Sequence, residues 1–362
     1  MRLYIHDMKR FKRHKDLGLF DQDFRLEKLS KLGDPLDPLE RLSKGVDFEL
    51  FRNLLTEKLT KLAKGKGGRP PYDYVLMFKI LILQRYYNLS DDQAEFQIND
   101  RISFMRFLNL TISDDIPDSK TIWNFTERLT DIKLVQELFD LFGKELERLG
   151  LIVNEGKIID ASFVEAPRQR NSKDKNKQIK EGKGDQLWNE EPIKKRQKDI
   201  DARWTKKNFQ NYYGYKNHAK VPARSAGGDA KSKLIDTYQV TDASVHDSQA
   251  VDNLLDQKDQ ELYADSAYVG QEDVLEKHQV KNQIHEKGYR KNPLTEEQIA
   301  SNKEKSRIRV RVEHVFGFME NSMGSMFFRK VGIKRAEASV GLMNLTYNMF
   351  RKIQLTQVGT CV

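Results

Sequence analysis

The sequence contains almost no cysteine and no long apolar run, and each absence excludes a class of protein. Cys361 is the only cysteine among 362 residues, so disulfide frameworks and cysteine-ligated zinc sites are excluded. No apolar stretch approaches the roughly 18 residues that a membrane-spanning helix needs. Residues 1–7 also lack the apolar region of a signal peptide. We therefore expect a protein of the reducing cytoplasm.

Basic residues exceed acidic residues by only nine over the whole chain, 63 to 54, but the excess is concentrated. Residues 168–233 contain 19 Lys and Arg against 8 Asp and Glu, so the remainder of the chain is slightly acidic. The first part, about 168–210, has few aliphatic residues, which predicts a solvated insertion, partly disordered or helical. Nine more basic residues lie in 303–335. Two basic patches favour a groove that follows DNA phosphates; the alternative for the first patch is a solubilising loop.

The length, at roughly 150 residues per domain, suggests about two domains with flanking segments. Residues 1–66 are expected to be an irregular, basic segment. Residues 67–150 are expected to be helical, with a capping box that begins at Ser90, a helix start at Asp118 and a helix end at Gly150. This helical domain is a candidate DNA-binding helix-turn-helix module or, alternatively, a packing domain without DNA contacts.

The pattern changes from helices to strands after Gly150. Strands are predicted at 157–164, 213–221, 234–241, 261–265 and 281–286, and helices at 248–257 and 303–320. Three strands in succession, followed by alternating strands and helices, indicate an α/β domain with a mixed sheet over residues 151–335. A closing helix and tail occupy 336–362. The basic insertion falls between the first two strands.

Three carboxylates are the candidates for chemistry. Asp160 lies in the middle of the first predicted strand, where a carboxylate costs several kcal/mol unless it is paired or bound to a metal. Asp265 lies at the C-terminal end of a later strand, the edge at which α/β sheets bind ligands, although a helix N-cap would also explain it. Glu313 lies at the border of an apolar helical face, where a salt bridge to Arg309 is the alternative role.

Taken together, the three acids indicate one kind of site. Two aspartates and a glutamate, with no cysteine and no paired-histidine motif, offer only hard oxygen ligands. Such a set suits Mg²⁺ or Mn²⁺ rather than Zn²⁺. Two such ions, held by carboxylates and bridged by a phosphate, activate water or a 3′-hydroxyl for in-line displacement at phosphorus. We therefore predict metal-dependent phosphoryl transfer at Asp160, Asp265 and Glu313.

A series of short blocks with a particular order and spacing runs from about residue 68 to residue 352. The blocks are Gly68–Tyr72, Leu89–Glu95, Ile116–Trp123, Ile159–Ser162, Tyr215–Lys216 with His218, His246–Asp247, Ala264–Tyr268, Arg309–Gly317 and Gly341–Met349. In this order they resemble bacterial insertion-sequence transposases of the DDE superfamily, of the insertion-sequence-five type. No single block is highly specific, but their order and spacing together are.

The resemblance implies an RNase H-like fold with an N-terminal helical domain. It implies that Asp160, Asp265 and Glu313 are the catalytic, metal-binding residues and that Mg²⁺ or Mn²⁺, as two ions, is the cofactor. Double-stranded DNA would be the substrate. The implied activity is cleavage at the terminal inverted repeats of a mobile element and strand transfer into target DNA. A homodimeric synaptic complex at the bacterial nucleoid is implied by analogy.

Further residues are implied as DNA contacts. Lys216 and His218 belong to the second-strand block, and Arg309 matches the arginine of the family's tyrosine-arginine-glutamate-lysine signature. The tyrosine and lysine positions of that signature are Ser306 and Glu320 in this sequence. An acid at the lysine position puts that DNA contact in doubt. Two explanations are open: Arg329 or Lys330 replaces the lysine, or an acidic residue is usual at this position in this branch of the family.

Aromatic residues and one histidine complete the candidates. Trp204, in the basic insertion, is a candidate to stack on a displaced base near a cleaved end; its alternative role is an apolar anchor. His246 is an auxiliary candidate that would orient water or a phosphate, with a surface histidine as the alternative. Trp123 is expected to be a residue of the hydrophobic core, on the buried face of its helix.

Two other functions remain open at this point. An RNase H-like nuclease that cuts without joining would use the same carboxylates. A domesticated, non-catalytic DNA-binding protein would keep the helical domain and the basic patches, but binding alone would not require Asp160, Asp265 and Glu313.

Overall fold

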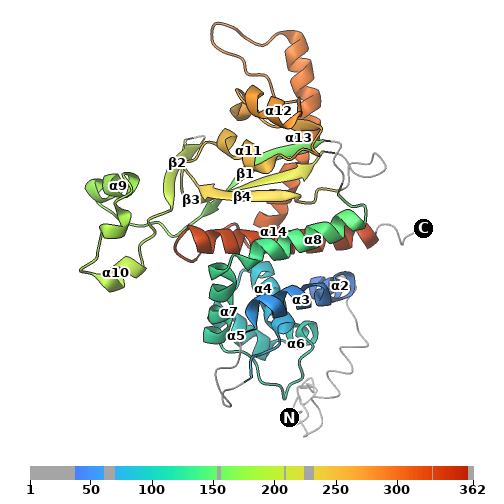
Figure 1. The fold of residues 1–362 in the computed structure, drawn as a ribbon, viewed down its shortest axis with the longest axis vertical. Helices are drawn as coiled ribbons and strands as arrows, with labels where there is room; N and C mark the ends of the chain where they lie inside the picture. The colour runs from blue at the N-terminus through green and yellow to red at the C-terminus, as the bar shows by residue number, and fades with distance from the viewer. Residues whose placement is uncertain are drawn as a thin grey trace, which may run out of the picture.

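The computed structural model describes residues 37–60, 70–152, 156–207, 209–223, 232–327 and 329–357. Figure 1 shows a mixed sheet with helices on one side and a helical bundle on the other. Two helices, α8 (Leu134–Arg148) and α14 (Ile333–Gln357), run between the sheet and the bundle. No helix in the described part of the chain is long and apolar enough to cross a membrane.

The bundle is built from short helices. They are α2 (Pro38–Gly45), η1 (Phe48–Phe51), α3 (Arg52–Leu59), α4 (Tyr74–Tyr86), α5 (Asp91–Asp100), α6 (Ile102–Leu108) and α7 (Ser119–Asp131), followed by α8. The predicted capping box is confirmed, because Ser90 Oγ accepts the Gln93 N–H and the Gln93 side chain accepts the Ser90 N–H. The helix start at Asp118 is confirmed as well, because its carboxylate accepts the Thr121 N–H at 2.6 Å.

The prediction of irregular structure over residues 1–66 is wrong for 38–59, where α2, η1 and α3 form. These helices are too short to be stable alone, so tertiary burial stabilises them. Leu42, Phe51 and Leu55 are fully buried, and the ring centroid of Phe51 lies 4.8 Å from that of Phe78 on α4. Residues 1–36 and 61–69 lie outside the described residues.

The sheet confirms the predicted mixed α/β fold. Its strands are β1 (Lys157–Glu165), β2 (Arg203–Lys207), β3 (Gln210–Pro222), β4 (Thr237–Asp242), β5 (Glu261–Tyr263) and β6 (Lys281–Asn282). β3 pairs antiparallel with β1 along the whole of β1, and also with β4 and β2. β5 pairs parallel with β6 and with the first two residues of β1 only. From Asp160 onward, therefore, the second edge of β1 is not covered by β5.

The insertion between β1 and β3 contains helices, as predicted, and also a strand, which was not predicted. It contains α9 (Lys173–Lys180), η2 (Gly184–Gln186) and α10 (Pro192–Arg196), which form a lobe beside the sheet (Figure 1). The unpredicted strand is β2, which forms a hairpin with the start of β3. Cross-strand contact explains this strand, because the rings of Trp204 and Tyr213 lie opposite each other with centroids 5.0 Å apart.

The helices that follow the sheet strands position the predicted acids. They are η3 (Asp247–Ala250), α11 (Val251–Leu254), η4 (Ser266–Tyr268), α12 (Glu272–His278) and α13 (Glu296–Ser322). α13 begins seven residues before the predicted start at 303, with Thr295 and Gln298 forming its capping box. The apolar face predicted for this helix is confirmed: Val312, Val315, Phe316 and Met319 are its buried residues.

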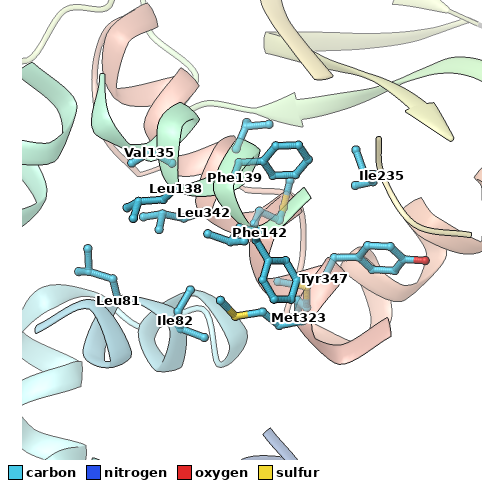
Figure 2. Packing of buried hydrophobic residues seen from close by; sticks show 14 of the residues in the cluster. Leu81, Ile82, Val135, Leu138, Phe139, Phe142, Ile235, Met323, Leu342 and Tyr347 are labelled. Atoms are coloured by element: carbon cyan, nitrogen blue, oxygen red, sulfur yellow. The ribbon is translucent and has the colours of Figure 1, made fainter. Parts of the chain in front are cut away.

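The main core surrounds α14. Every residue from Val340 to Phe350 is buried. Figure 2 shows Leu342 and Tyr347 of α14 in one cluster with Phe142 of α8 and Ile82 of α4. This continuous core connects the bundle with the sheet, so the domain division at residue 150 stays a prediction from the sequence.

A buried ion network lies at the start of β1. Lys157 of β1 and Lys220 of β3 lie diagonally across these neighbouring strands and are almost completely buried. Lys157 Nζ lies 2.7 Å from Asp236 Oδ2, and Lys220 Nζ lies 2.8 Å from Asp259 Oδ2 and 3.3 Å from Asp236 Oδ2. Each buried charge is therefore matched by one of opposite sign, three residues before Asp160.

Removing one acid from this network should destabilise the fold. Asp259→Ala removes a fully buried carboxylate that contacts Lys220 and lies 3.8 Å from Lys157. It should lower the free energy of unfolding by about 3–5 kcal/mol in urea denaturation at pH 7. The control is Asp252→Ala, which removes an exposed partner of Lys277 and should leave the midpoint nearly unchanged. Equal midpoints for the two variants would contradict the prediction.

Candidate active site

Two of the predicted acids are carried by neighbouring strands: Asp160 lies on β1, and Asp265 lies two residues after the end of β5. Ile158 of β1 pairs with Tyr263 of β5 in the parallel ladder. Asp160 and Asp265 each follow two residues later, so the register places the two aspartates side by side. Asp265 is also the N-cap of η4, where its carboxylate accepts the Ala267 N–H at 2.8 Å. The capping role and the site position are thus compatible.

Arg309 connects the third acid to this pair. Its Nη1 donates to Asp160 Oδ2 at 3.1 Å, and its Nη2 lies 3.3 Å from Glu313 Oε1, one turn further along α13. The predicted salt bridge between Arg309 and Glu313 is therefore present, but it extends to Asp160. One guanidinium joins a strand and a helix that lie about 150 residues apart in the sequence.

The surroundings of Asp160 disfavour its charge. Burial raises the pKa of the Asp160 carboxyl to about 6, and the nearby negative charge of Asp265 adds to the rise. Arg309 and the Ala161 N–H, which donates to Asp160 Oδ1 at 2.9 Å, oppose this shift. The positive charge of Arg309 is therefore not enough to offset the effects that raise the pKa of Asp160.

The acids fit a divalent cation by their chemistry. Among the residues that the structure describes, no three His, Cys, Asp or Glu side chains form a group that holds a metal ion. Asp160 and Asp265 nevertheless offer hard oxygen ligands, and a cation there would offset the burial and the Asp265 charge that raise the pKa of Asp160. Glu313 is more exposed and is engaged with Arg309.

Sequence reasoning missed Tyr268 as a residue of this site. Its side chain is fully buried, and its hydroxyl has no hydrogen-bond partner in the described part of the chain. Burial raises its pKa well above the ordinary value, with contributions from Asp160, Asp247 and Asp265. Tyr268 is the last residue of the Ala264–Tyr268 block, which was noted for Asp265. The sequence around a tyrosine does not indicate that its hydroxyl lies near carboxylates.

A cleft of about 540 Å³ extends along the edge of β1 that β5 leaves open. Ala161, Ser162, Phe163, Glu165, Lys207, Tyr212, Glu320 and residues 325–327 line it. The Phe163 and Tyr212 rings stack with centroids 4.2 Å apart. Lys207, at the end of β2, is close enough for its charge to lower the pKa of Asp160. The cleft therefore begins beside Asp160 and has a cation and an aromatic pair on its walls.

Two of the predicted DNA contacts are buried inside the protein. Lys216 is buried, and its Nζ donates to Asp247 Oδ1 at 2.8 Å and to the Val245 carbonyl at 2.7 Å. His218 is fully buried, and its Nε2 lies 2.8 Å from Thr241 Oγ1. Burial lowers the pKa of His218 to about 4, so the ring is neutral at pH 7. Both predictions are wrong because each side chain is buried and bonded inside the fold, Lys216 to Asp247 and His218 to Thr241.

The remaining predicted residues lie on the surface or at its border. Trp204 is 44% exposed, with the Arg168 guanidinium 6.0 Å from its ring. His246 is exposed and caps η3, with Nδ1 2.8 Å from Ser248 Oγ. Arg329 is exposed and Lys330 is half-buried. Among the predicted DNA contacts, only Arg309 touches any of the three predicted catalytic acids in the described part of the chain.

Antiparallel strands continued by the parallel strands β5 and β6, with Asp160 on β1 and Asp265 just after β5, are consistent with an RNase H-like fold. Residues 153–349 match the family described as transposase DDE domain, and residues 25–128 match the transposase domain family DUF772. The chain belongs to the DDE transposase family and is a DNA transposase, which confirms the resemblance noted in the sequence. The nuclease and the non-catalytic alternatives are not favoured. The family generally uses divalent metal ions. No solved structure matches the chain.

Neutralising Asp160 should stabilise the metal-free protein. Its folded pKa of about 6 exceeds the ordinary value of 3.8, so the native state binds this proton more tightly than the unfolded chain. Stability therefore falls as the pH rises from about 4 to 6. Asp160→Asn avoids this loss and should raise the free energy of unfolding by at most about 3 kcal/mol at pH 8, with little effect at pH 3.5.

Urea denaturation in EDTA at both pH values measures this effect. Glu313→Gln is the control, because its carboxylate is exposed and should change stability far less. A destabilised Asp160→Asn variant at pH 8 would show that the carboxylate, and not its neutral form, suits the fold.

Proposed function

We propose that Asp160, Asp265 and Glu313 carry out the DNA cleavage and joining of this transposase. The observation that supports this most directly is the guanidinium of Arg309, which contacts Asp160 and Glu313 at 3.1 and 3.3 Å. The parallel pairing of β1 with β5 adds to this, because Asp160 and Asp265 each lie two residues beyond the Ile158–Tyr263 pair. These contacts support a site built from acids on β1, just after β5 and on α13. Such a concentration of acids suits metal-dependent phosphoryl transfer.

The cofactor in this proposal is Mg²⁺ or Mn²⁺, as two ions, held by Asp160 and Asp265 with Glu313 completing the set. When bound, the ions supply an activated oxygen nucleophile and neutralise charge at the reacting phosphate. The chain's own residues prepare the site: Arg309 favours the ionised form of Asp160, and the Ala161 N–H orients its second oxygen. Arg309 is thus a positioning residue rather than a simple DNA contact.

The reaction consists of two displacements at phosphorus. In cleavage, the oxygen of water bonds to phosphorus and the bond to the 3′ oxygen breaks, which frees a 3′-hydroxyl at the element end. In joining, that hydroxyl bonds to a phosphorus of the target and releases the target's own 3′ oxygen. Positioning is the main contribution of the protein to both steps.

The substrate strand is proposed to lie in the cleft beside β1. Lys207 provides a phosphate contact there, and the stacked rings of Phe163 and Tyr212 provide an apolar wall. Glu320, at the position of the signature lysine, lines the same cleft. We infer that Lys207 supplies the positive charge that Glu320 does not. Trp204, exposed on the same hairpin, stays a candidate to stack on a base.

Substituting any of the three acids should abolish cleavage. Asp160→Asn, Asp265→Asn and Glu313→Gln remove negative charge and metal ligands, so cleavage of a labelled duplex carrying the element's end should fall at least about 10³-fold. Binding of the same duplex, measured by gel shift, should stay nearly unchanged.

Glu304→Gln is the matched control for these variants. Glu304 is an exposed glutamate on α13 that pairs with Arg307, away from the acids. It should cleave like the unmodified protein. Full cleavage by any of the three acid variants would remove that residue from the site.

The order of cutting and joining can be tested separately. With pre-cleaved ends that carry a free 3′-hydroxyl, the protein should join them to a target plasmid, because the same carboxylates activate that hydroxyl. Light scattering of the product complex should show two chains with two ends, as expected for a homodimer acting at the nucleoid. Cutting without joining would support the nuclease alternative, and one chain per complex would contradict the dimer.

A further inference from the structure

A second cavity, of about 350 Å³, lies between the bundle and the start of α14. Its walls come from α4, α5 and α7, which Figure 1 shows below α14, and from residues 327, 329–331 and 335 with Arg196 of α10. Phe327 lines both this cavity and the cleft beside β1, so the two hollows adjoin. Nothing in the proposed cleavage site uses this cavity.

Positive charge gathers on the walls of the cavity. The charged residues that line it are Arg85, Arg196, Arg329, Lys330, Arg335 and Asp91. Arg335 is already matched, because its guanidinium lies 2.7 Å from the Glu127 carboxylate. Asp91 accepts the Gln84 amide at 2.7 Å. Four cations thus face one carboxylate, and we call this cavity the cation pocket.

The four cations are not neutralised by the protein. Arg329 donates to the carbonyl and the side-chain oxygen of Asn88, at 3.1 and 2.7 Å, and both partners are uncharged. In the described part of the chain, none of the four forms an ion pair. Burial lowers the pKa of Lys330, although Asp91 and Glu127 oppose the shift. The cation pocket therefore has positive charge in excess.

The guanidinium of Arg85 is only partly hydrogen-bonded. Among the residues that the structure describes, its Nε is buried without a hydrogen-bond partner, and its Nη2 reaches the Ser325 carbonyl at 3.4 Å. Burial, with repulsion from Arg329, lowers the pKa of Arg85 to about 10. A buried cation without an anion costs several kcal/mol, and a bound anion would offset that cost.

The rest of the pocket wall is apolar and includes an exposed indole. The expectation that Trp123 lies in the core is wrong: it is 43% exposed and lines the pocket. Leu81, Leu89, Phe327, Val331 and Leu342 line the same space. A pocket with cations on one part of its wall and an aromatic ring with aliphatic groups on the other suits a phosphate joined to a sugar and a base.

We propose that the cation pocket binds a backbone phosphate of the DNA whose scissile phosphate lies in the cleft beside β1. This proposal rests on the proposed function, because the two hollows meet at Phe327. The phosphate would take the free donors of Arg85, Arg329 and Lys330. Such a contact reads no base and adds affinity on any sequence.

The salt dependence of DNA binding tests this proposal. The experiment uses the full chain with Asp160→Asn, so that no cleavage intervenes, and measures duplex affinity between 50 and 200 mM salt. Arg329→Gln and Lys330→Gln should each reduce the slope of log affinity against log salt by about 0.9, one phosphate contact. The loss should be the same on an element end and on an unrelated duplex.

Lys258→Gln is the matched control, because Lys258 is exposed in the turn before β5, at the opposite end of that strand from Asp265. It should leave the slope unchanged. Unchanged slopes for Arg329→Gln and Lys330→Gln would overturn the pocket while leaving the carboxylate chemistry intact. Conversely, cleavage by Asp160→Asn would contradict the proposed function without touching this result.

A second arm separates DNA from a free phosphate. Calorimetric titration of the DNA-free chain with inorganic phosphate should show no saturable site at millimolar concentration. A saturable site that Lys330→Gln abolishes, with the duplex slope unchanged, would assign the pocket to a free anion and overturn the proposal. Because Arg85 is partly structural, its own variant is not needed for the test.

Discussion

Helix α14 is buried on every side over Val340–Phe350, and the positions of the bundle and the sheet depend on how its polar residues are satisfied. Apolar burial holds the helix between the two layers but does not select one register. Asn344 exchanges hydrogen bonds with Asn217 of β3, and Asn348 bonds both main-chain groups of Ile235. An unpaired buried amide is costly, so these contacts fix the helix against the sheet.

Strand β1 carries buried charge at two positions, Lys157 and Asp160, and the two charges are balanced to different extents. At its start, Lys157 is neutralised by Asp236 within a closed network. Three residues later, burial raises the pKa of Asp160 to about 6, and the charge of Asp265 adds to the rise while one guanidinium, that of Arg309, opposes it. The first arrangement supports the fold. The second leaves a demand for positive charge at the point where the cleft begins, as a site for a cation and a phosphate requires.

Local features were predictable and distant ones were not. The caps at Ser90 and Asp118, and the buried face of α13, depend on residues three or four apart, which the sequence shows directly. The short helices before residue 60 form through contacts with distant segments, so no local pattern predicted them. The strand β2 forms by pairing with the start of β3, and its own residues do not have a clear strand pattern. Lys216 and His218 were assigned to DNA from their block, but both side chains are buried and bonded to residues of other segments, Asp247 and Thr241.

By itself, the sequence determined which acids carry the chemistry that we propose, the helices and strands that bear them, and the family to which the chain belongs. Spacing within a helix or strand is a local property, so these conclusions need no knowledge of neighbours. Only the tertiary structure decided that Asp160 and Asp265 share a level, that Arg309 reaches Asp160, and that the cations of the pocket meet. Those contacts join residues far apart in the chain, and packing around α14 brings them together.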